Sequence, residues 1–129
     1  ARDADYAAMT WHPHDPGLSR WMDLYHQVAR SGGGEPDAGR RLRSWGRQAR
    51  FTRVEPTASV WSFADSDDLQ WWSKSWADRL TESDFGRQAR ERGLADSSEF
   101  ESLARVWRVW GTQADAWFAV LHGEILCTV

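Results

Sequence analysis

The side chains best suited to chemistry lie near the beginning of the sequence, where Asp3, Asp5 and Tyr6 precede Trp11 and His12. A tyrosine hydroxyl can orient a substrate or assist its deprotonation. The same residues can equally form an ordinary chain terminus. The residues alone leave both interpretations open.

A second candidate site is the run His12, Pro13, His14 and Asp15, which has two imidazoles close together. No third ligand accompanies the two imidazoles in the sequence. A solvated loop at the mouth of a substrate pocket is therefore favoured over a metal site.

Two segments have features of phosphate binding. Gly32, Gly33 and Gly34 follow a predicted helix rather than a strand, which favours a linker or helix cap over a phosphate loop. The Arg-rich segment 40–53 has no interleaved aromatic platform on the same face, which favours a solvated helix face. With a net charge of −3, we expect no nucleic-acid partner.

The sequence contains ten tryptophans, and the spacing of six of them separates two groups. Trp11 and Trp71 lie off the periodic stripes and are the better candidates for a ligand pocket. Four further tryptophans recur at the spacing of a buried helix face and are predicted to be buried: Trp72, Trp76, Trp107 and Trp110.

Length and composition indicate one domain of ordinary globular character, with 129 residues that are 41% hydrophobic. No apolar run approaches the ~20 residues that span a bilayer, so no membrane partner is expected. Cys127, the single cysteine, cannot form an internal disulfide and is predicted to be a small buried residue without a nucleophilic role. These features favour a cytoplasmic location.

Hydrophobic periodicity predicts an α+β chain with about five helices and two antiparallel strands, 54–63 and 117–127. The helices are expected over 18–29, from Asp37 onward, over 65–81 and 84–92, and from a capping box at Ser98 to Trp110. Residues 1–17 are expected to be irregular.

The second predicted strand raises a question of topology. It is apolar on both faces, as in a strand inside a larger sheet, and two strands alone do not form a stable sheet. We therefore expect it to pair with a strand that this sequence does not encode. It is predicted to be continuous with a bulge near Gly123, and a tight hairpin is the alternative.

Several segments, in order and with matching spacing, resemble the C-terminal half of class I S-adenosylmethionine-dependent methyltransferases. The similarity is to the ubiquinone/menaquinone biosynthesis-type branch found in actinobacteria. The segments that carry it are 2–6, 11, 15–16, 34–42, 71–72, 76–79, 81–83 and 117–127.

The resemblance implies that residues 1–129 are one unit from an α/β Rossmann-like fold. Segments 54–63 and 117–127 would be its last two strands, with the final strand antiparallel and inserted between the fifth and sixth. The intervening helices would form a lid over the substrate. The cofactor-binding half would be absent, so S-adenosylmethionine belongs to the parent enzyme and no cofactor or metal is expected for the isolated chain.

The resemblance also implies a pocket for a small-molecule acceptor. Its expected residues come from the start of the chain, the first helix and two tryptophans behind them: Tyr6, Met9, Trp11, His12, Tyr25, Trp61 and Trp71. The expected partner is the missing N-terminal half or a second copy of the chain. One alternative is a non-catalytic binding or dimerisation module that pairs through its sheet edge. Another is a Trp-rich cavity that binds a hydrophobic ligand without chemistry.

Overall fold

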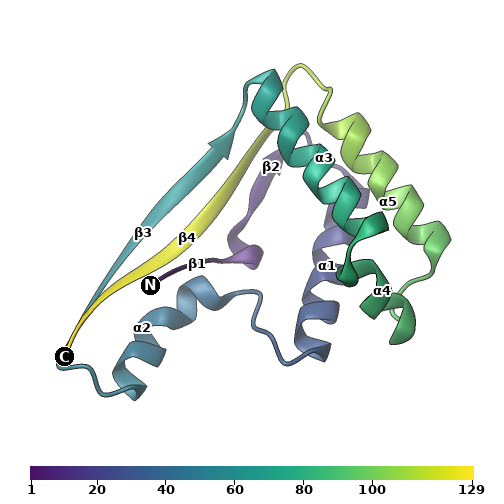
Figure 1. The fold of residues 1–129 in the computed structure, drawn as a ribbon. Helices are drawn as coiled ribbons and strands as arrows, with labels where there is room; N and C mark the ends of the chain where they lie inside the picture. The colour runs from purple at the N-terminus through teal and green to yellow at the C-terminus, as the bar shows by residue number, and fades with distance from the viewer. The chain divides into compact units, whose positions relative to one another are not determined.

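The computed structural model describes residues 1–129, and the chain forms two compact units (Figure 1). The sheet unit contains Ala1–Thr10, Glu35–Ser62 and Ala119–Val129. The helical unit contains Trp11–Gly34 and Phe63–Phe118. The buried residues of the two units differ, and each unit is therefore a separate possible location of a binding site.

A four-stranded sheet is built around the last strand, β4 (Trp117–Thr128). The strand β4 pairs with β1 (Arg2–Ala4), β2 (Thr10–His12) and β3 (Arg53–Phe63). β1 is antiparallel to β4, with Asp3 opposite Gly123. The Thr52 amide donates to the Thr128 carbonyl at 3.0 Å, so β3 begins beside the end of β4.

Two of these strands correct the sequence prediction. Residues 1–17 are not irregular, because they contain β1, the short 3-10 helix η1 (Tyr6–Ala8) and β2. The expectation that β4 lacks a neighbour in this chain is also wrong, since β1, β2 and β3 all pair with it. Three-residue strands rich in polar residues have no hydrophobic alternation to reveal them, and backbone hydrogen bonds alone define them.

The long strands agree with the prediction to within one residue. The predicted strand 54–63 is found as 53–63, and 117–127 is found as 117–128. β4 is one continuous strand rather than a hairpin at Gly123. The helix α2 (Ala38–Gln48) explains the glycine: a Cβ on Gly123 would lie 2.0 Å from the Gly39 carbonyl oxygen. A side chain at Gly123 would therefore push α2 away from the sheet.

The helical unit consists of α1 (Pro16–Ser31), α3 (Ser66–Glu82), α4 (Asp84–Glu91) and α5 (Ser97–Trp110). α3 and α5 lie side by side (Figure 1). Asp15 caps α1 by accepting from the Gly17 amide at 2.7 Å, and Pro16 follows as the first helical residue, two residues before the predicted start.

The predicted capping box at Ser98 is not the cap of α5. Asp96 caps this helix by accepting from the Glu99 amide at 2.8 Å, so α5 begins one residue earlier, at Ser97. Aspartate is among the residues preferred at this capping position, and an acidic side chain there suits the positive end of the helix dipole. Sequence spacing alone does not rank these two caps.

The interior of the helical unit is aromatic. Trp76, Trp107 and Trp110 are buried as predicted, together with Trp21 of α1, whereas Trp72 is only half-buried. The Trp110 indole donates to the Pro13 carbonyl at 3.0 Å and so ties the segment before α1 to α5. None of the helices is both long enough and apolar enough to cross a membrane.

Candidate functional site

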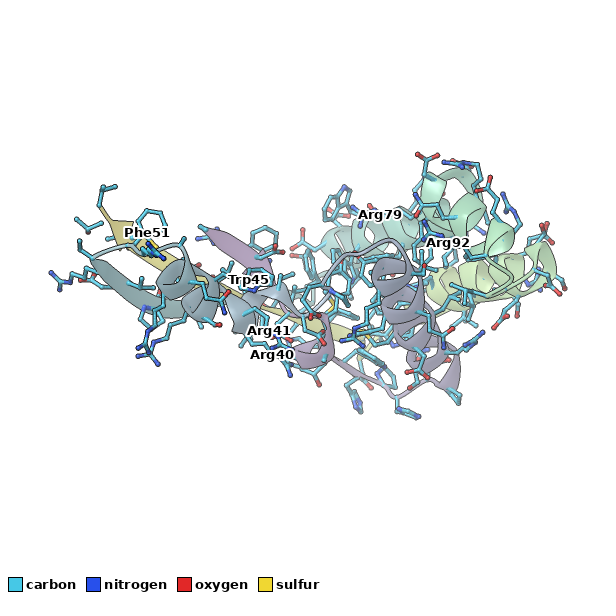
Figure 2. All side chains as sticks on the ribbon, turned by 90° about the horizontal axis from the view of Figure 1, so that it is seen from below. Arg40, Arg41, Trp45, Phe51, Arg79 and Arg92 are labelled. Atoms are coloured by element: carbon cyan, nitrogen blue, oxygen red, sulfur yellow. The ribbon has the colours of Figure 1, made fainter.

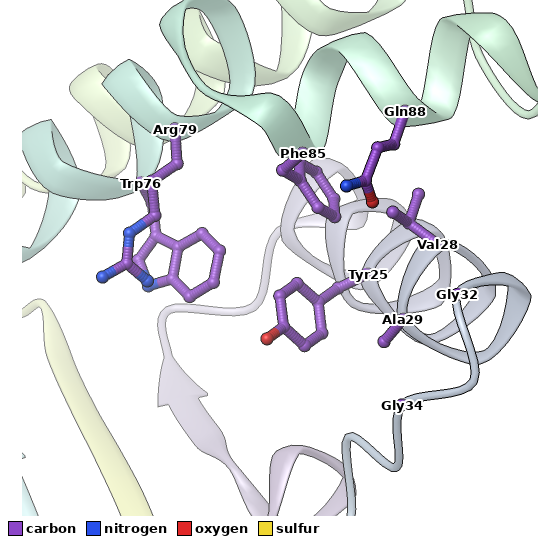
Figure 3. A pocket seen from close by; sticks show the side chains of 9 residues that line it. All are labelled: Tyr25, Val28, Ala29, Gly32, Gly34, Trp76, Arg79, Phe85 and Gln88. Atoms are coloured by element: carbon purple, nitrogen blue, oxygen red, sulfur yellow. The ribbon is translucent and has the colours of Figure 1, made fainter.

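The strongest candidate site is a cavity of about 380 Å³ within the helical unit (Figure 3). This volume lies in the range of small-molecule sites. The lining residues come from α1 and its end, from α3 and from α4: Tyr25, Val28, Ala29, Gly32, Gly34, Trp76, Arg79, Phe85 and Gln88. Apolar and aromatic side chains form most of the wall, and no acidic residue contributes to it.

Three aromatic rings define the cavity wall. The rings of Tyr25 and Phe85 are stacked, with centroids 5.5 Å apart and 25° between their planes. Trp76 meets Tyr25 edge to face at 5.5 Å and 87°. Trp21 lies behind Trp76 with its centroid 4.7 Å away. Because buried aromatic neighbours support these rings, the cavity keeps a flat apolar surface rather than collapsing.

The end of α1 forms another part of the wall. Gly32 caps this helix and Gly33 takes a positive φ of 81°, so the predicted helix-cap role of the glycine run is confirmed. Arg92, which follows α4, donates to the Val28 carbonyl at 3.2 Å and to the Ser31 hydroxyl at 2.7 Å. This guanidinium satisfies a carbonyl at the end of α1 and fixes α1 against α4.

Arg79 is the cationic group of the cavity. Its guanidinium carbon lies 4.7 Å from the ring centroid of Trp76, and the side chain is exposed (Figures 2 and 3). Arg79 forms no salt bridge with a carboxylate. The Tyr25 hydroxyl and the Gln88 amide are the other polar side-chain groups of the lining (Figure 3). The cavity therefore combines an apolar wall with a positive charge that has no counter-ion in the protein.

A second hollow of about 370 Å³ on α3 and α5 differs in this respect. Its two cations, Lys74 and Arg108, both face Asp78: the Lys74 ammonium is ion-paired to it, and an Arg108 nitrogen lies 3.8 Å from Asp78 Oδ1. The ion pair with Asp78 also raises the pKa of Lys74. Both cations of this hollow therefore share one carboxylate, whereas Arg79 has no carboxylate partner.

Four of the seven predicted site residues belong to the helical unit. Tyr25 lines the cavity. Trp11 stacks on Phe118 at 5.6 Å and meets Trp21 edge to face at 6.4 Å, so it joins the aromatic interior rather than the lining. His12 is exposed, and Trp71 is 62% exposed beside Phe63 and Trp72.

The other three predicted residues belong to the sheet unit. Met9 is buried, and the Tyr6 amide donates to the Pro36 carbonyl at 3.1 Å. Trp61 is 50% exposed, and its ring centroid lies 4.2 Å from that of His122. Trp61 therefore covers a buried histidine on the sheet, and its role as a substrate residue stays a prediction.

The sheet unit has a polar cluster around this histidine. His122 is 6% exposed, and its Nδ1 has no hydrogen-bond partner. Burial lowers the pKa of His122, and the nearby positive charge of Arg2 lowers it further. Hydrogen bonds from Ser59, Arg2 and Thr57 lower the pKa of Glu124. Cys127 is half-buried, with its sulfur 3.3 Å from the position of a Cβ on Gly46.

Sequence reasoning missed most of the cavity. Trp76 was assigned only to the hydrophobic core, and Arg79, Phe85 and Gln88 were not assigned to any site. One signal was present: Trp76 and Arg79 are separated by three positions on a helix, so both side chains lie on the same face. Charge on the apolar side of an amphipathic helix is a recognisable indication of a site.

Comparison with known proteins gives one similarity of note. No model of a known protein family matches the sequence. Over 96 residues the chain is 28% identical to a Schizosaccharomyces pombe protein described as an uncharacterised methyltransferase. The match covers 73% of this chain and 34% of the relative, so the chain spans about a third of that protein's length. The similarity relates the chain to methyltransferases as a class.

Proposed function

We propose that this chain is the acceptor-binding part of a methyltransferase that uses S-adenosylmethionine, with the helical unit forming the substrate lid. The observation that carries the proposal is the 28% identity, over 96 residues, to a protein described as a methyltransferase. Because the chain spans 34% of that relative, the proposal assigns it part of the enzyme rather than the whole reaction.

The sheet unit supports the proposal through its strand arrangement. β4 is antiparallel to β1 and also pairs with β3, which agrees with a last strand inserted between two earlier strands. β1 pairs with β4 alone and leaves its outer edge open. We propose that a strand of the cofactor-binding half of the parent enzyme pairs with this edge.

We propose that S-adenosylmethionine binds outside this chain, because the chain's glycine run is not placed like a cofactor loop. The glycine run at 32–34 ends α1, whereas cofactor loops of nucleotide-binding folds follow a strand and open a helix. The proposal therefore places cofactor binding outside this chain and derives no reaction step through it. The chain's own contribution is to bind the acceptor and hold it in position.

Calorimetry tests the proposal that the cofactor binds outside this chain. S-adenosylmethionine and its demethylated product are titrated into two samples. One is the 129-residue chain, and the other is the protein translated from the longest reading frame that encodes this chain. We expect binding by the longer protein and none by the chain alone. Binding by the chain alone would overturn the assignment of the cofactor site, and no binding by either would overturn the methyltransferase proposal.

The alternative function is a non-catalytic module that self-associates through a sheet edge. β3 has eleven residues and pairs with β4 alone, so its outer edge is open to a second copy. However, the strand contains Pro56 and the ion-paired Arg53 and Glu55, features that oppose strand addition. Sedimentation equilibrium separates the two possibilities: a monomer excludes edge pairing, whereas a dimer dispersed by an added charge at Val60 favours it.

A further inference from the structure

We infer that the cavity of the helical unit binds a flat apolar anion, with the ring system among Tyr25, Trp76 and Phe85 and the negative charge at Arg79. The inference rests on the proposed function only in treating this anion as the methyl acceptor. Ligand binding itself follows from the composition and charge of the cavity.

The shape of the ligand follows from the wall. Tyr25 and Phe85 present nearly parallel rings, and Trp76 stands across Tyr25 at 87°. Val28 and Ala29 complete the apolar surface next to Tyr25 (Figure 3). Planar ring systems gain most from such walls, because stacked and edge-on aromatic contacts add to the burial of apolar area. A chain-like or strongly polar ligand would leave these surfaces unused.

The charge of the ligand follows from Arg79. Trp76 holds the guanidinium at 4.7 Å, and the cation has no carboxylate partner, unlike Arg20, Lys74 and Arg87 of the same unit. The lining contains no aspartate or glutamate that would oppose an anion. A planar guanidinium binds carboxylate oxygens in a fixed geometry, and the Gln88 amide of the lining is a further donor.

The test uses two probes of the same shape, 2-naphthoate and its neutral amide, titrated into the 129-residue chain by calorimetry. We expect the acid to bind about fivefold more tightly than the amide, since an exposed ion pair contributes up to about a factor of five. In the Arg79→Gln variant this preference should disappear while the amide affinity stays the same. The Arg105→Gln variant is the matched control, because Arg105 is an exposed arginine of α5 outside the lining.

A second variant locates the ligand. Ala29→Trp fills the cavity from α1 and should weaken both probes, while circular dichroism confirms that the variant is folded. Three results would each overturn the inference. They are a preference for the acid that remains in Arg79→Gln, an equal loss of affinity for the acid in the Arg79 and Arg105 variants, and unchanged binding of the probes in Ala29→Trp. So would a parent chain that does not bind 2-naphthoate.

These titrations contain no S-adenosylmethionine, so their outcome is independent of the methyl-transfer proposal. If 2-naphthoate binding depends on Arg79 but the longer protein does not bind S-adenosylmethionine, the inference stands and the proposed function is wrong. Methyl transfer by the longer protein, without probe binding in the cavity, would do the reverse.

Discussion

The helical unit and the sheet unit fill their interiors in different ways. In the helical unit, the Trp21 ring meets those of Trp76 and Trp107 edge to face, with centroids 4.7 and 4.9 Å away. In the sheet unit, Gly39 and Gly123 allow helix and strand backbones to approach closely. The helical unit therefore depends on side-chain volume, and the sheet unit depends on the absence of side chains and on hydrogen bonds.

This difference bears on function. Aromatic rings line the cavity of the helical unit, and further buried rings pack behind them. This packing can give the cavity a fixed shape, which a binding site requires. Close backbone packing at Gly39 and Gly123 instead holds α2 on the sheet. We therefore place ligand binding in the helical unit and a scaffold role in the sheet unit.

The largest expected effect is the loss of ring volume in the helical unit. Trp21 is fully buried, so Trp21→Ala should lower the free energy of unfolding by about 4 kcal/mol through lost burial and the cavity left behind. Urea denaturation followed by circular dichroism measures the loss. Trp71→Ala is the control, because a ring that is 62% exposed should cost about 1 kcal/mol or less.

Hydrogen exchange then tests whether the two interiors are separate. In Trp21→Ala, amide protection should fall first in α1, α3 and α5 and less in α2 and β3. Equal losses in both units would contradict the comparison, because they would indicate one cooperative interior.

Added volume is expected to be the damaging change in the sheet unit. Gly123→Ala places a methyl group 2.0 Å from the Gly39 carbonyl oxygen, and we expect a loss of about 3 kcal/mol. Gly46→Ala is the matched control in α2, because its nearest neighbours are side-chain atoms at 3.1–3.3 Å that can move. A Gly123→Ala variant as stable as the Gly46→Ala variant would show that the two backbones can separate without cost.

A smaller loss is expected from the ion pair that fixes the start of α2. Asp5 is 1% exposed and accepts from the Arg40 side chain at 2.6 Å through each oxygen, and from the Arg40 amide at 3.2 Å. Asp5→Ala should cost about 2 kcal/mol through the loss of these charged hydrogen bonds. Asp3→Ala, at an exposed position in β1, should cost less in the same denaturation assay. Equal costs would show that Asp5 contributes no more than a surface carboxylate.

The sequence was sufficient for the elements that have strong periodicity. The helices and long strands are amphipathic or apolar over ten or more residues in most cases, and their limits agree with the structure within a few residues. β1 and β2 could not be predicted, because each has three residues and is defined by its pairing with β4, more than a hundred positions away. Pairing at such separation depends on the folded chain.

The cavity was less accessible to sequence reasoning than the elements around it. The family resemblance implied Tyr25 as a pocket residue. Phe85 and Gln88 come from a separate short helix whose packing against α1 no local pattern specifies. Arg79 was not assigned to any site from the sequence. Only the fold reveals that it has no acidic partner and lies over Trp76.

The smallest effect should be a pH dependence that belongs to the sheet unit alone. His122 is the one histidine of this unit, and burial lowers its pKa from the ordinary value of 6.5. The folded state therefore binds this proton less tightly than the unfolded chain, and acid favours unfolding. The stability contribution of neutral His122 is complete above pH 6.5 and is lost as pH falls from there through the lowered pKa.

Unfolding free energy measured by urea denaturation from pH 8 to pH 5 checks this prediction, with hydrogen exchange in β3 and β4 as the local measure. His122→Leu should remove the decline below pH 6.5, whereas His12→Gln, at an exposed position of β2, should retain it. The hydrogen bonds to Glu124 lower its pKa from 4.5, so its own contribution is lost only in more acidic solution and does not obscure the test. A decline that persists in His122→Leu would assign the proton to another group, and the pH dependence would then not report on the sheet unit.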